Sequence, residues 1–375
     1  MREETAVITN VDIWTAYGRG IECCWEGLLR GKTAIQPCTR FDTGHFPSRM
    51  AAVVEGIGYG GKSSLVMQML VPLLESNKSL LPSDAVPVLA STTGEIDLLE
   101  KNVFEGTGGA VESGLGVLLE KLKAVTGIKG GGFVVSSACA SSSAALGFAA
   151  GLIQNGKHDC VLVAAVDAVT EFVFSGFSSL MALDPEPAKP FDRKRAGLSL
   201  GDGAGFILLM SCARAQREGR VVIGEIAGWA MTNDANHMTG PSRDGSGLKC
   251  AIQKALERAD VSAGDVGAIS SHGTGTVYND SMEMKAYAGV FGNPMPLYSI
   301  KGAVGHTMGA AGLIETAIAL RVLRERVIPA TIGLRDADPE AQNWVSLEKR
   351  KLEKNVVLLN NSGFGGVNAA LILKG

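Results

Sequence analysis

Cys139 is the residue whose position most strongly suggests chemistry. It follows a short apolar segment, Phe133–Val135, and precedes a run of small residues, Ser141–Gly147. We expect the first segment to be a buried strand and the second to begin a helix, which places the thiol at or near a helix N-terminus. The free N–H groups and the dipole at such a terminus stabilise a thiolate, so this position predicts a nucleophile.

Two of the five histidines lie where a site would also be expected. His272 belongs to the segment Ser270–Thr276 and His306 to the segment Ser299–Gly312, and both segments follow or contain an expected strand. Both histidines have glycine neighbours, which let a ligand approach the backbone closely. Since loops after strands carry the sites of α/β proteins, we expect these histidines to share a site with the cysteine.

A cysteine with two histidines suits thioester chemistry. The Cys139 thiolate would take an acyl group from a thioester. The neutral imidazoles of His272 and His306 would donate N–H bonds to the enolate oxygen that forms when a malonyl thioester loses carbon dioxide. That enolate would attack the acyl-cysteine and give a β-keto product. Phe364, between glycines in Asn360–Asn368, would add a backbone N–H for the acyl oxyanion and an aromatic gate.

Taken together, these segments resemble those of the β-ketoacyl synthase family, the condensing enzymes of the thiolase superfamily. The resemblance spans nearly the whole chain and rests on five motifs in family order: the Cys139 segment, Pro190–Gly197 with Gly201–Gly205, His272–Thr276, Lys301–His306 and Gly363–Gly366. Each motif alone would be a weak signal. The resemblance implies an acyltransferase, a β-ketoacyl-acyl-carrier-protein synthase that performs decarboxylative Claisen condensation in fatty-acid or polyketide-type biosynthesis.

The resemblance also implies roles for single residues. Cys139, His272 and His306 form the catalytic triad. Lys301 is a fourth catalytic residue that orients the site and tunes its charge. The backbone N–H groups of Cys139 and Phe364 form the oxyanion hole. The other matched residues are Thr274 and Thr276 for the phosphopantetheine arm, Phe364 as gate, Glu315 as a buried acid, and Asp280 and Glu283 as a structural acidic pair.

Partners and cofactors follow from the same resemblance. The phosphopantetheine arm would be supplied by an acyl carrier protein, and no bound cofactor is expected. Arg195 and Lys62 are the candidate contacts for an acidic carrier. Because members of this family usually form dimers, the resemblance implies a homodimer, or a heterodimer with a related synthase subunit.

The composition limits the class of protein. The chain has 375 residues, of which 46% are hydrophobic and 19% charged, enough to bury a large core. The net charge of −3 argues against a nucleic-acid-binding protein. The seven cysteines are odd in number and irregularly spaced, which excludes a disulfide scaffold or a metal site and indicates the cytoplasm. The acidic N-terminus is unlike a signal peptide, and Ala144–Ile153 is too short to span a membrane.

Short strands alternate with helices along the chain, which predicts an α/β fold with buried sheets. Each half contains a strand that leads into a helix of small residues, at Cys139 and at His306, and this indicates an internal duplication. We expect one half over residues 1–220, with the nucleophile, and one over 221–375, with both histidines. The resemblance adds a thiolase-like fold with the duplicated halves in a layered αβαβα arrangement.

Three finer expectations concern single elements. Pro72 should end or bend a helix over residues 63–74. One long helix should run over residues 305–324. The region 44–132 fits the family poorly, with a shortened stretch at 104–132, and this region should hold the unusual features of the acyl pocket, the dimer contact and the carrier surface.

Other classes of protein remain to be weighed. A non-condensing partner subunit, similar to a chain-length factor, is the alternative that the shortened region favours, but such a subunit lacks the nucleophile that Cys139 provides. A biosynthetic thiolase would need a second cysteine near the C-terminus, where this chain has none. A chalcone-type synthase would use asparagine where this chain offers a histidine.

Overall fold

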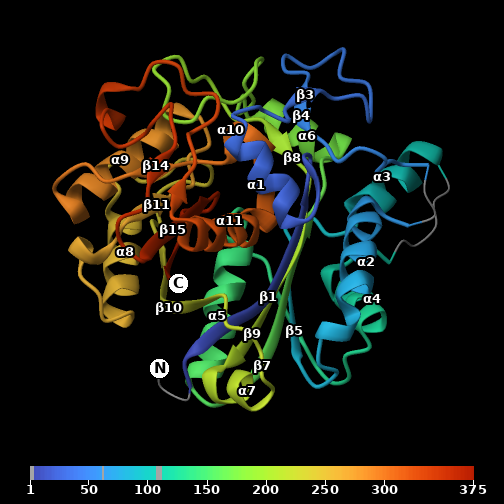
Figure 1. Cartoon of the computed structure of the whole chain (residues 1–375). Helices are drawn as coiled ribbons and strands as arrows, with labels where there is room; N and C mark the ends of the chain where they lie inside the picture. The colour runs from blue at the N-terminus through green and yellow to red at the C-terminus, as the bar shows by residue number, and fades with distance from the viewer. Residues whose placement is uncertain (1–3, 61–62, 107–111) are drawn as a thin grey trace.

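A computed structural model describes residues 4–60, 63–106 and 112–375, and an eleven-stranded mixed sheet runs through it (Figure 1). The first part of the sheet consists, in spatial order, of β6 (Phe133–Val135), β5 (Val86–Ala90), β7 (Cys160–Asp167), β9 (Gly203–Ser211) and β1 (Ala6–Thr15), with β2 (Gly18–Arg19) paired to β1. The second part consists of β10 (Gly224–Asn233), β16 (Val367–Lys374), β15 (Val356–Gly363), β11 (Ala268–Ser270) and β12 (Leu297–Tyr298).

The two parts of the sheet repeat one topology. We count the strands of each part outward from the junction between β1 and β10, leaving out β2. In both parts the strand nearest the junction is then the first in sequence, and the fifth, fourth, second and third follow it. The three strands farthest from the junction are parallel, and the other pairings are antiparallel in both parts. The parts join where β1 pairs with β10 through Val7 with Glu225 and Ile8 with Gly224. This repetition is the arrangement that a duplicated α/β fold requires.

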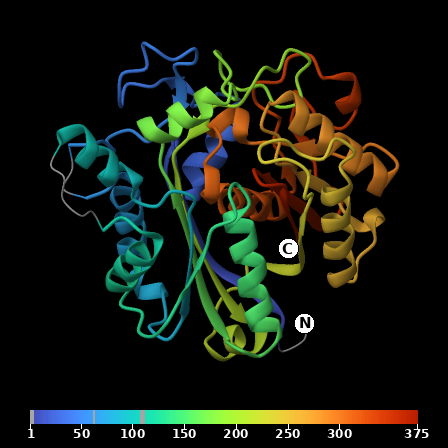
Figure 2. The ribbon, with the colours of Figure 1, turned by 180° about the vertical axis from the view of Figure 1, so that it is seen from behind.

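Helices form layers on both sides of the sheet. Two of them, α5 (Ser141–Gln154) and α11 (Ala311–Glu325), pack against each other between the two parts, and Figure 2 shows α5 in this central position. On the outer face of the first part lie α2 (Leu65–Asn77) and α4 (Leu115–Thr126), and on that of the second part lies α8 (Ser246–Arg258), with α9 (Val277–Phe291) beside it. Three clusters of buried apolar side chains fill the spaces between these layers.

Shorter elements complete the chain. The remaining α-helices are α1 (Ile21–Leu29), α3 (Ile96–Glu105), α6 (Glu171–Ser179), α7 (Cys212–Arg217) and α10 (Lys301–Val304). Single 3₁₀ turns are η1 (Lys78–Leu80), η2 (Ala263–Asp265), η3 (Met308–Ala310) and η4 (Pro339–Ala341). Two small sheets contain β3 (Gln36–Pro37), β4 (Met50–Ala52) and β8 (Leu200–Gly201), and β13 (Val327–Ile328) with β14 (Arg350–Lys351).

Small residues let the central layer pack closely. A Cβ added at Gly147 or Gly151 of α5 would lie 3.1 or 2.8 Å from the Trp229 ring of β10. Where α5 crosses α11, a Cβ added at Gly312 would overlap the hydroxyl of Ser143. The run of small residues after the nucleophile is therefore needed for the helix to fit between the two parts of the sheet.

Three expectations about single elements are corrected. Pro72 lies inside α2, which continues to Asn77, so the proline does not end this helix. Phe133 and Val134 are 41% and 37% exposed, because β6 is an edge strand of the described sheet and is not buried.

The expected long helix over residues 305–324 starts later than expected, at Ala311. Gly305 has φ 70° and Met308 has φ 50°, and this left-handed backbone separates the short helix α10 from α11. The helix therefore begins only at Ala311, and His306 lies in the loop before it. Its imidazole is thus carried by a tight turn with two left-handed residues.

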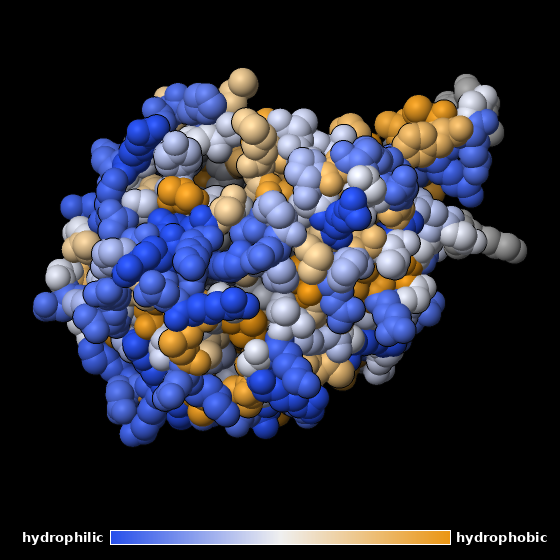
Figure 3. All heavy atoms as spheres, turned by 90° about the horizontal axis from the view of Figure 1, so that it is seen from above, coloured by the Kyte–Doolittle hydropathy of each residue, from blue (hydrophilic) through white to orange (hydrophobic). Residues whose placement is uncertain are grey.

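The region 44–132 includes α3, which the sequence reasoning did not identify. This helix exposes Leu99, Val103 and Phe104. Figure 3, which looks down on the top of Figure 1, shows apolar surface gathered on the side of the molecule where α3 lies.

Among the described residues, no helix is both long and apolar enough to cross a membrane.

Candidate active site

Cys139 lies in the tight turn between β6 and α5. Ala138, just before it, has φ 47°, and α5 begins two residues after it with Ala140 as its N-cap. The end of β15 (Val356–Gly363) passes so close that a Cβ added at Gly363 would lie 3.0 Å from the Cys139 nitrogen. Glycine suits this close approach, which brings the Phe364 backbone N–H within hydrogen-bond reach of the thiol. The N–H groups of Cys139 and Phe364 thus lie together, as an oxyanion hole requires.

The thiol is held in its protonated form. Burial raises the pKa of Cys139 to about 11, while the nearby charge of Lys301 and the Phe364 N–H act in the opposite direction. The position at the start of a helix is therefore as expected from the sequence, but the expected thiolate is not favoured in the unacylated site. Desolvation of the charged form outweighs the helix terminus.

His272 is buried at the end of β11 and its ring is oriented by Asn361. The Asn361 side-chain nitrogen lies 3.2 Å from Nδ1 of His272 and 2.7 Å from Oε2 of Glu315. Burial, together with the charge of Lys301 and the neighbouring His306, lowers the pKa of His272 well below its usual value. The imidazole is therefore neutral at physiological pH.

His306 faces His272 edge-to-face. The two ring centroids are 5.2 Å apart, with an interplanar angle of 87°. Among the described residues neither ring nitrogen of His306 has a hydrogen-bond partner, although the side chain is buried. Burial and the charge of Lys301 lower its pKa well below the usual value. Two neutral rings with free nitrogens can donate to an oxygen that becomes negative during a reaction.

Lys301 and Glu315 form an ion pair behind the histidines. Lys301 Nζ contacts Glu315 Oε1, and both side chains are only 2% exposed. Burial raises the pKa of Glu315, and the lysine charge and the amide of Asn361 oppose that rise. The pair therefore places one positive charge beside the site without exposing it to the pocket.

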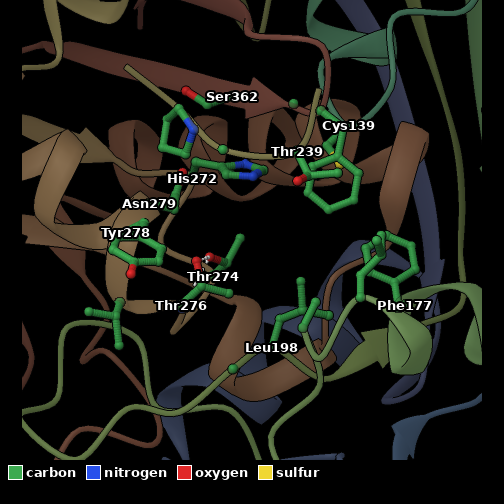
Figure 4. Close-up of a pocket in the computed structure, with 18 of the residues that line it drawn as sticks. Cys139, Phe177, Leu198, Thr239, His272, Thr274, Thr276, Tyr278, Asn279 and Ser362 are labelled. Atoms are coloured by element: carbon green, nitrogen blue, oxygen red, sulfur yellow. Dashed lines mark hydrogen bonds between the residues drawn. The ribbon is translucent and has the colours of Figure 1, made fainter. Parts of the chain in front are cut away.

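The pocket in front of these residues has a volume of about 690 Å³. The predicted residues among those that line it are Cys139, His272, His306, Thr274, Thr276 and Phe364. Figure 4 shows Cys139 and His272 along one wall, with Thr274 and Thr276 on the loop below them. Lys301 and Glu315 are not among its lining residues. A cavity of this size accommodates an extended thioester arm.

Phe364 stacks on a residue that the sequence reasoning missed. The rings of Phe364 and Phe177 of α6 have centroids 5.6 Å apart and an interplanar angle of 28°. Both rings line the pocket. The segment of α6 has no residue type that signals chemistry, so only the fold could have found this contact.

The loop that carries His272 is held from behind by acidic side chains. Glu283 accepts the backbone N–H groups of His272 and Gly273 at 2.8 and 2.7 Å. Asp280 accepts the N–H of Gly275 at 3.2 Å and that of Phe191 at 2.8 Å. Both carboxylates are buried. Their contacts fit the structural role expected for this pair.

The hydroxyls of Thr274 and Thr276 lie 2.9 Å apart and face the pocket. They are in a position to receive the amide groups of a bound arm.

In the part of the chain that the structure describes, no group of three or more His, Cys, Asp and Glu side chains could hold a metal ion.

The two expected carrier contacts have different outcomes. The side chain of Arg195 is 6% exposed and pairs with Asp338 at 2.7 Å, 3.7 Å from Asp280. This burial leaves almost no surface for a carrier protein, so the expectation for Arg195 is corrected in favour of a structural role. Lys62 lies outside the described residues.

Family models match two stretches of the chain. The model described as "Beta-ketoacyl synthase, N-terminal domain" matches residues 118–215, and "Beta-ketoacyl synthase, C-terminal domain" matches residues 223–335. The chain is 30% identical to the 3-oxoacyl-[acyl-carrier-protein] synthase 2 of Vibrio cholerae over 417 residues, with 100% of both chains covered. The chain belongs to the β-ketoacyl synthase family.

Further similarities connect this β-ketoacyl synthase to polyketide systems. It is 30% identical to the ketoacyl synthase alpha subunit of the tetracenomycin polyketide synthase of Streptomyces glaucescens, over 99% of this chain and 97% of that protein. The solved structure of the ishigamide ketosynthase/chain length factor matches with a TM-score of 0.89 and 28% identity, covering 99% and 98% of the two chains.

These findings confirm the thiolase-like α/β fold. They also identify the protein as a β-ketoacyl-acyl-carrier-protein synthase, an acyltransferase of fatty-acid or polyketide-type biosynthesis. The alternative, a non-condensing partner subunit, is not favoured.

Proposed function

We propose that Cys139 carries the acyl group during the synthase reaction. Its sulfur attacks the carbonyl carbon of an acyl-carrier thioester, and the carrier leaves as a free thiol that takes the cysteine proton. The backbone N–H groups of Cys139 and Phe364 receive the negative oxygen of the tetrahedral intermediate. The observation that supports this most is the hydrogen bond that the Phe364 backbone N–H makes to the Cys139 thiol. The backbone at Gly363 also passes close to Cys139, since an added Cβ there would lie 3.0 Å from the Cys139 nitrogen.

His272 and His306 act in the second half of the reaction. A malonyl carrier enters, and its carboxylate leaves as carbon dioxide while the electron pair forms an enolate. The two neutral imidazoles donate N–H bonds to the enolate oxygen, and burial keeps them neutral. The enolate carbon attacks the acyl carbonyl on Cys139, the carbon–sulfur bond breaks, and the β-ketoacyl carrier is released. The Cys139 thiolate that leaves takes one proton from solvent water.

The division of roles is tested by replacing His306. We expect His306→Ala to lower the rate of malonyl-carrier decarboxylation by about 100-fold, as loss of one donor to a developing oxyanion does. Acylation of Cys139 should change much less. Both rates can be followed by mass spectrometry, with Cys139→Ala as the control that cannot be acylated. An equal loss of both rates would contradict the role of His306.

The pocket mouth supports a proposal for the carrier arm. The hydroxyls of Thr274 and Thr276 line the pocket, and exposed Arg243 lies at its mouth with its guanidinium 5.0 Å from the Tyr278 ring centre. We propose that a phosphopantetheine arm, carried by an acyl carrier protein, extends along these residues toward Cys139. We expect Arg243→Glu to lose activity on carrier-bound substrates and to keep its activity on a short free thioester. Equal losses on both substrates would contradict this contact.

Exposed apolar residues support a proposal for the subunit partner. β6 is the edge of the sheet, and its side chains Phe133 and Val134 are partly exposed. An unpaired edge with apolar side chains is a ready site for strand pairing. We propose that β6 pairs with a second subunit, the same chain or a related one. Val134→Lys should then convert a dimer into a monomer in light scattering, and an unchanged mass would exclude this contact.

We further propose that residues 1–220 and 221–375 are the two duplicated halves, since each contributes one five-strand repeat. The first half would hold the nucleophile and the second both histidines. All seven cysteines are free, which supports a reducing compartment and hence the cytoplasm.

A further inference from the structure

We propose that Asn361 is a positioning residue that keeps the proton of His272 on Nε2, so that this ring always presents an N–H donor to the pocket. The inference rests on the proposed decarboxylation and adds a residue to it. Asn361 lies on β15 and is fully buried. Its side chain touches neither the acyl group nor the malonyl group in the proposed reaction, because it is not among the residues that line the pocket.

The contacts of the amide group form a short chain. The hydroxyl of Ser143, on α5, contacts the amide oxygen of Asn361. The amide nitrogen lies 2.7 Å from Oε2 of Glu315, on α11, and 3.2 Å from Nδ1 of His272. Glu315 in turn is paired with Lys301. All of these side chains are buried, so water does not compete for their hydrogen bonds.

These neighbours permit only one orientation of the amide. The carboxylate of Glu315 has no proton to give while Lys301 balances its charge, so it must face the NH₂ group of Asn361. Turning the amide over would set the acceptor oxygens of Asn361 and Glu315 2.7 Å apart. The Ser143 hydroxyl can donate or accept, so the Glu315 contact alone selects the orientation. The second hydrogen of the same NH₂ group then points at His272.

The orientation of the amide decides where His272 carries its proton. A neutral imidazole has one N–H and one bare nitrogen. Because Nδ1 receives a hydrogen from Asn361, Nδ1 must be the bare nitrogen and Nε2 must carry the proton. His306 differs, since neither of its ring nitrogens has a partner among the described residues. His272 is thus the donor that is set before the substrate binds.

The chain also gives Lys301 a defined part in the site. Its charge keeps Glu315 an acceptor, Glu315 orients Asn361, and Asn361 selects the proton position on His272. Residues of both halves of the molecule take part, because Ser143 comes from the helix that follows the nucleophile.

The test is nuclear magnetic resonance of protein labelled with ¹⁵N-histidine, which distinguishes a bare ring nitrogen from a protonated one. In the wild type we expect His272 to have a bare Nδ1 and a protonated Nε2. Asn361→Leu keeps the size of the side chain but removes the amide, so both proton positions should become populated. Glu315→Gln should have a similar effect, because a glutamine NH₂ group can donate to the Asn361 oxygen and lets that amide turn over.

The kinetic readout is the rate of malonyl-carrier decarboxylation. We expect Asn361→Leu to lower it by about 10- to 100-fold, the size of effect seen when a partner that orients a functional histidine is removed. Acylation of Cys139 should stay within a few-fold of the wild type. The matched control is Asn360→Leu, which removes a neighbouring buried amide bonded to Glu283 and Tyr287 and leaves the His272 ring contact intact.

The outcomes separate this inference from the proposed function. A protonated Nδ1 in the wild type, or an unchanged spectrum in Asn361→Leu, would overturn the role of Asn361 whatever the enzyme does. The control could also lose the Nε2 proton signal as much as Asn361→Leu does. The loss would then reflect general destabilisation, and the role of Asn361 would be overturned. A wild type that shows the expected spectrum but decarboxylates no malonyl carrier would refute the proposed reaction and leave the proton position established.

Discussion

A buried thiol beside a buried cation determines how the nucleophile reacts. The pKa of Cys139 is raised to about 11 by desolvation, and the charge of Lys301 is the largest influence that lowers it. The thiol must therefore lose its proton during attack, in a site where neutral imidazoles and backbone N–H groups are already in place. At neutral pH the unacylated cysteine is therefore mostly in its less reactive thiol form.

This arrangement predicts the pH dependence of alkylation. The rate at which iodoacetamide modifies Cys139 should rise as pH increases toward 11, because only the thiolate reacts. Lys301→Met should shift the curve to higher pH, since the charge that lowers the pKa is gone. Peptide mass spectrometry separates Cys139 from the other cysteines.

The paired variant Lys301→Met with Glu315→Gln serves as the control. It removes both buried charges and avoids leaving a carboxylate unpaired, which alone costs about 3–5 kcal/mol. A wild-type midpoint at or below 9.0, the ordinary value of a thiol pKa, would contradict the argument.

At the scale of elements, α9 holds the loop that carries His272. Asp280 and Glu283 lie on its first turns and accept the backbone N–H groups of His272, Gly273 and Gly275. Burial, with the nearby Glu283, raises the pKa of Asp280 to about 7. The carboxyl of Asp280 therefore titrates in the range where the enzyme is expected to work.

The titration of Asp280 predicts a change of stability with pH. Its pKa is about 7 in the folded state and 3.8 for the free side chain. Between these values the folded state holds a proton that the unfolded state has lost, so the free energy of unfolding should fall as pH rises from about 4 to about 7.

Asp280→Asn should remove this contribution. Chemical denaturation of both proteins at several pH values measures the difference. If the two proteins keep a constant difference in unfolding free energy from pH 4 to pH 7, the raised pKa is refuted.

The sequence predicted most of the elements, and the three residues proposed as the triad, Cys139, His272 and His306, line one pocket in the structure. Alternating strands and helices, and glycine-flanked histidines at strand ends, depend on local patterns that survive folding. The break between α10 and α11 was missed because it depends on left-handed backbone at Met308, a residue type that gives no such signal. Asn361 and Phe177 were missed for a different reason. Their importance comes only from contacts with residues far away in the chain.

At the scale of the whole molecule, the site exists because two halves meet. In the proposed division, Cys139 comes from the first half and both histidines from the second, and α5 and α11 pack against each other between them. The crossing of these helices is closest at Gly312, where an added Cβ would lie 2.5 Å from the Asn361 oxygen and 2.9 Å from the Ser143 nitrogen. Even a methyl group there would force neighbouring atoms to shift.

Gly312→Ala should therefore lower stability. Overpacking of a buried contact costs about 1–3 kcal/mol, and thermal or chemical unfolding measures it. The control is Gly116→Ala on the exposed face of α4, where an added Cβ meets nothing within 4 Å. That change should leave stability unchanged or raise it by up to about 1 kcal/mol. Equal effects of the two substitutions would contradict the tight crossing.

The most direct measurement of the central claim is the mass of the intact protein after incubation with acyl carrier thioesters of different chain lengths. We expect the mass to increase by one acyl group on Cys139, and a malonyl carrier added afterwards should remove that group as a β-ketoacyl carrier with release of carbon dioxide. Cys139→Ala should show no increase. The absence of any mass increase with every acyl donor, while an active homologue is labelled normally, would contradict the assignment of this protein as a condensing enzyme.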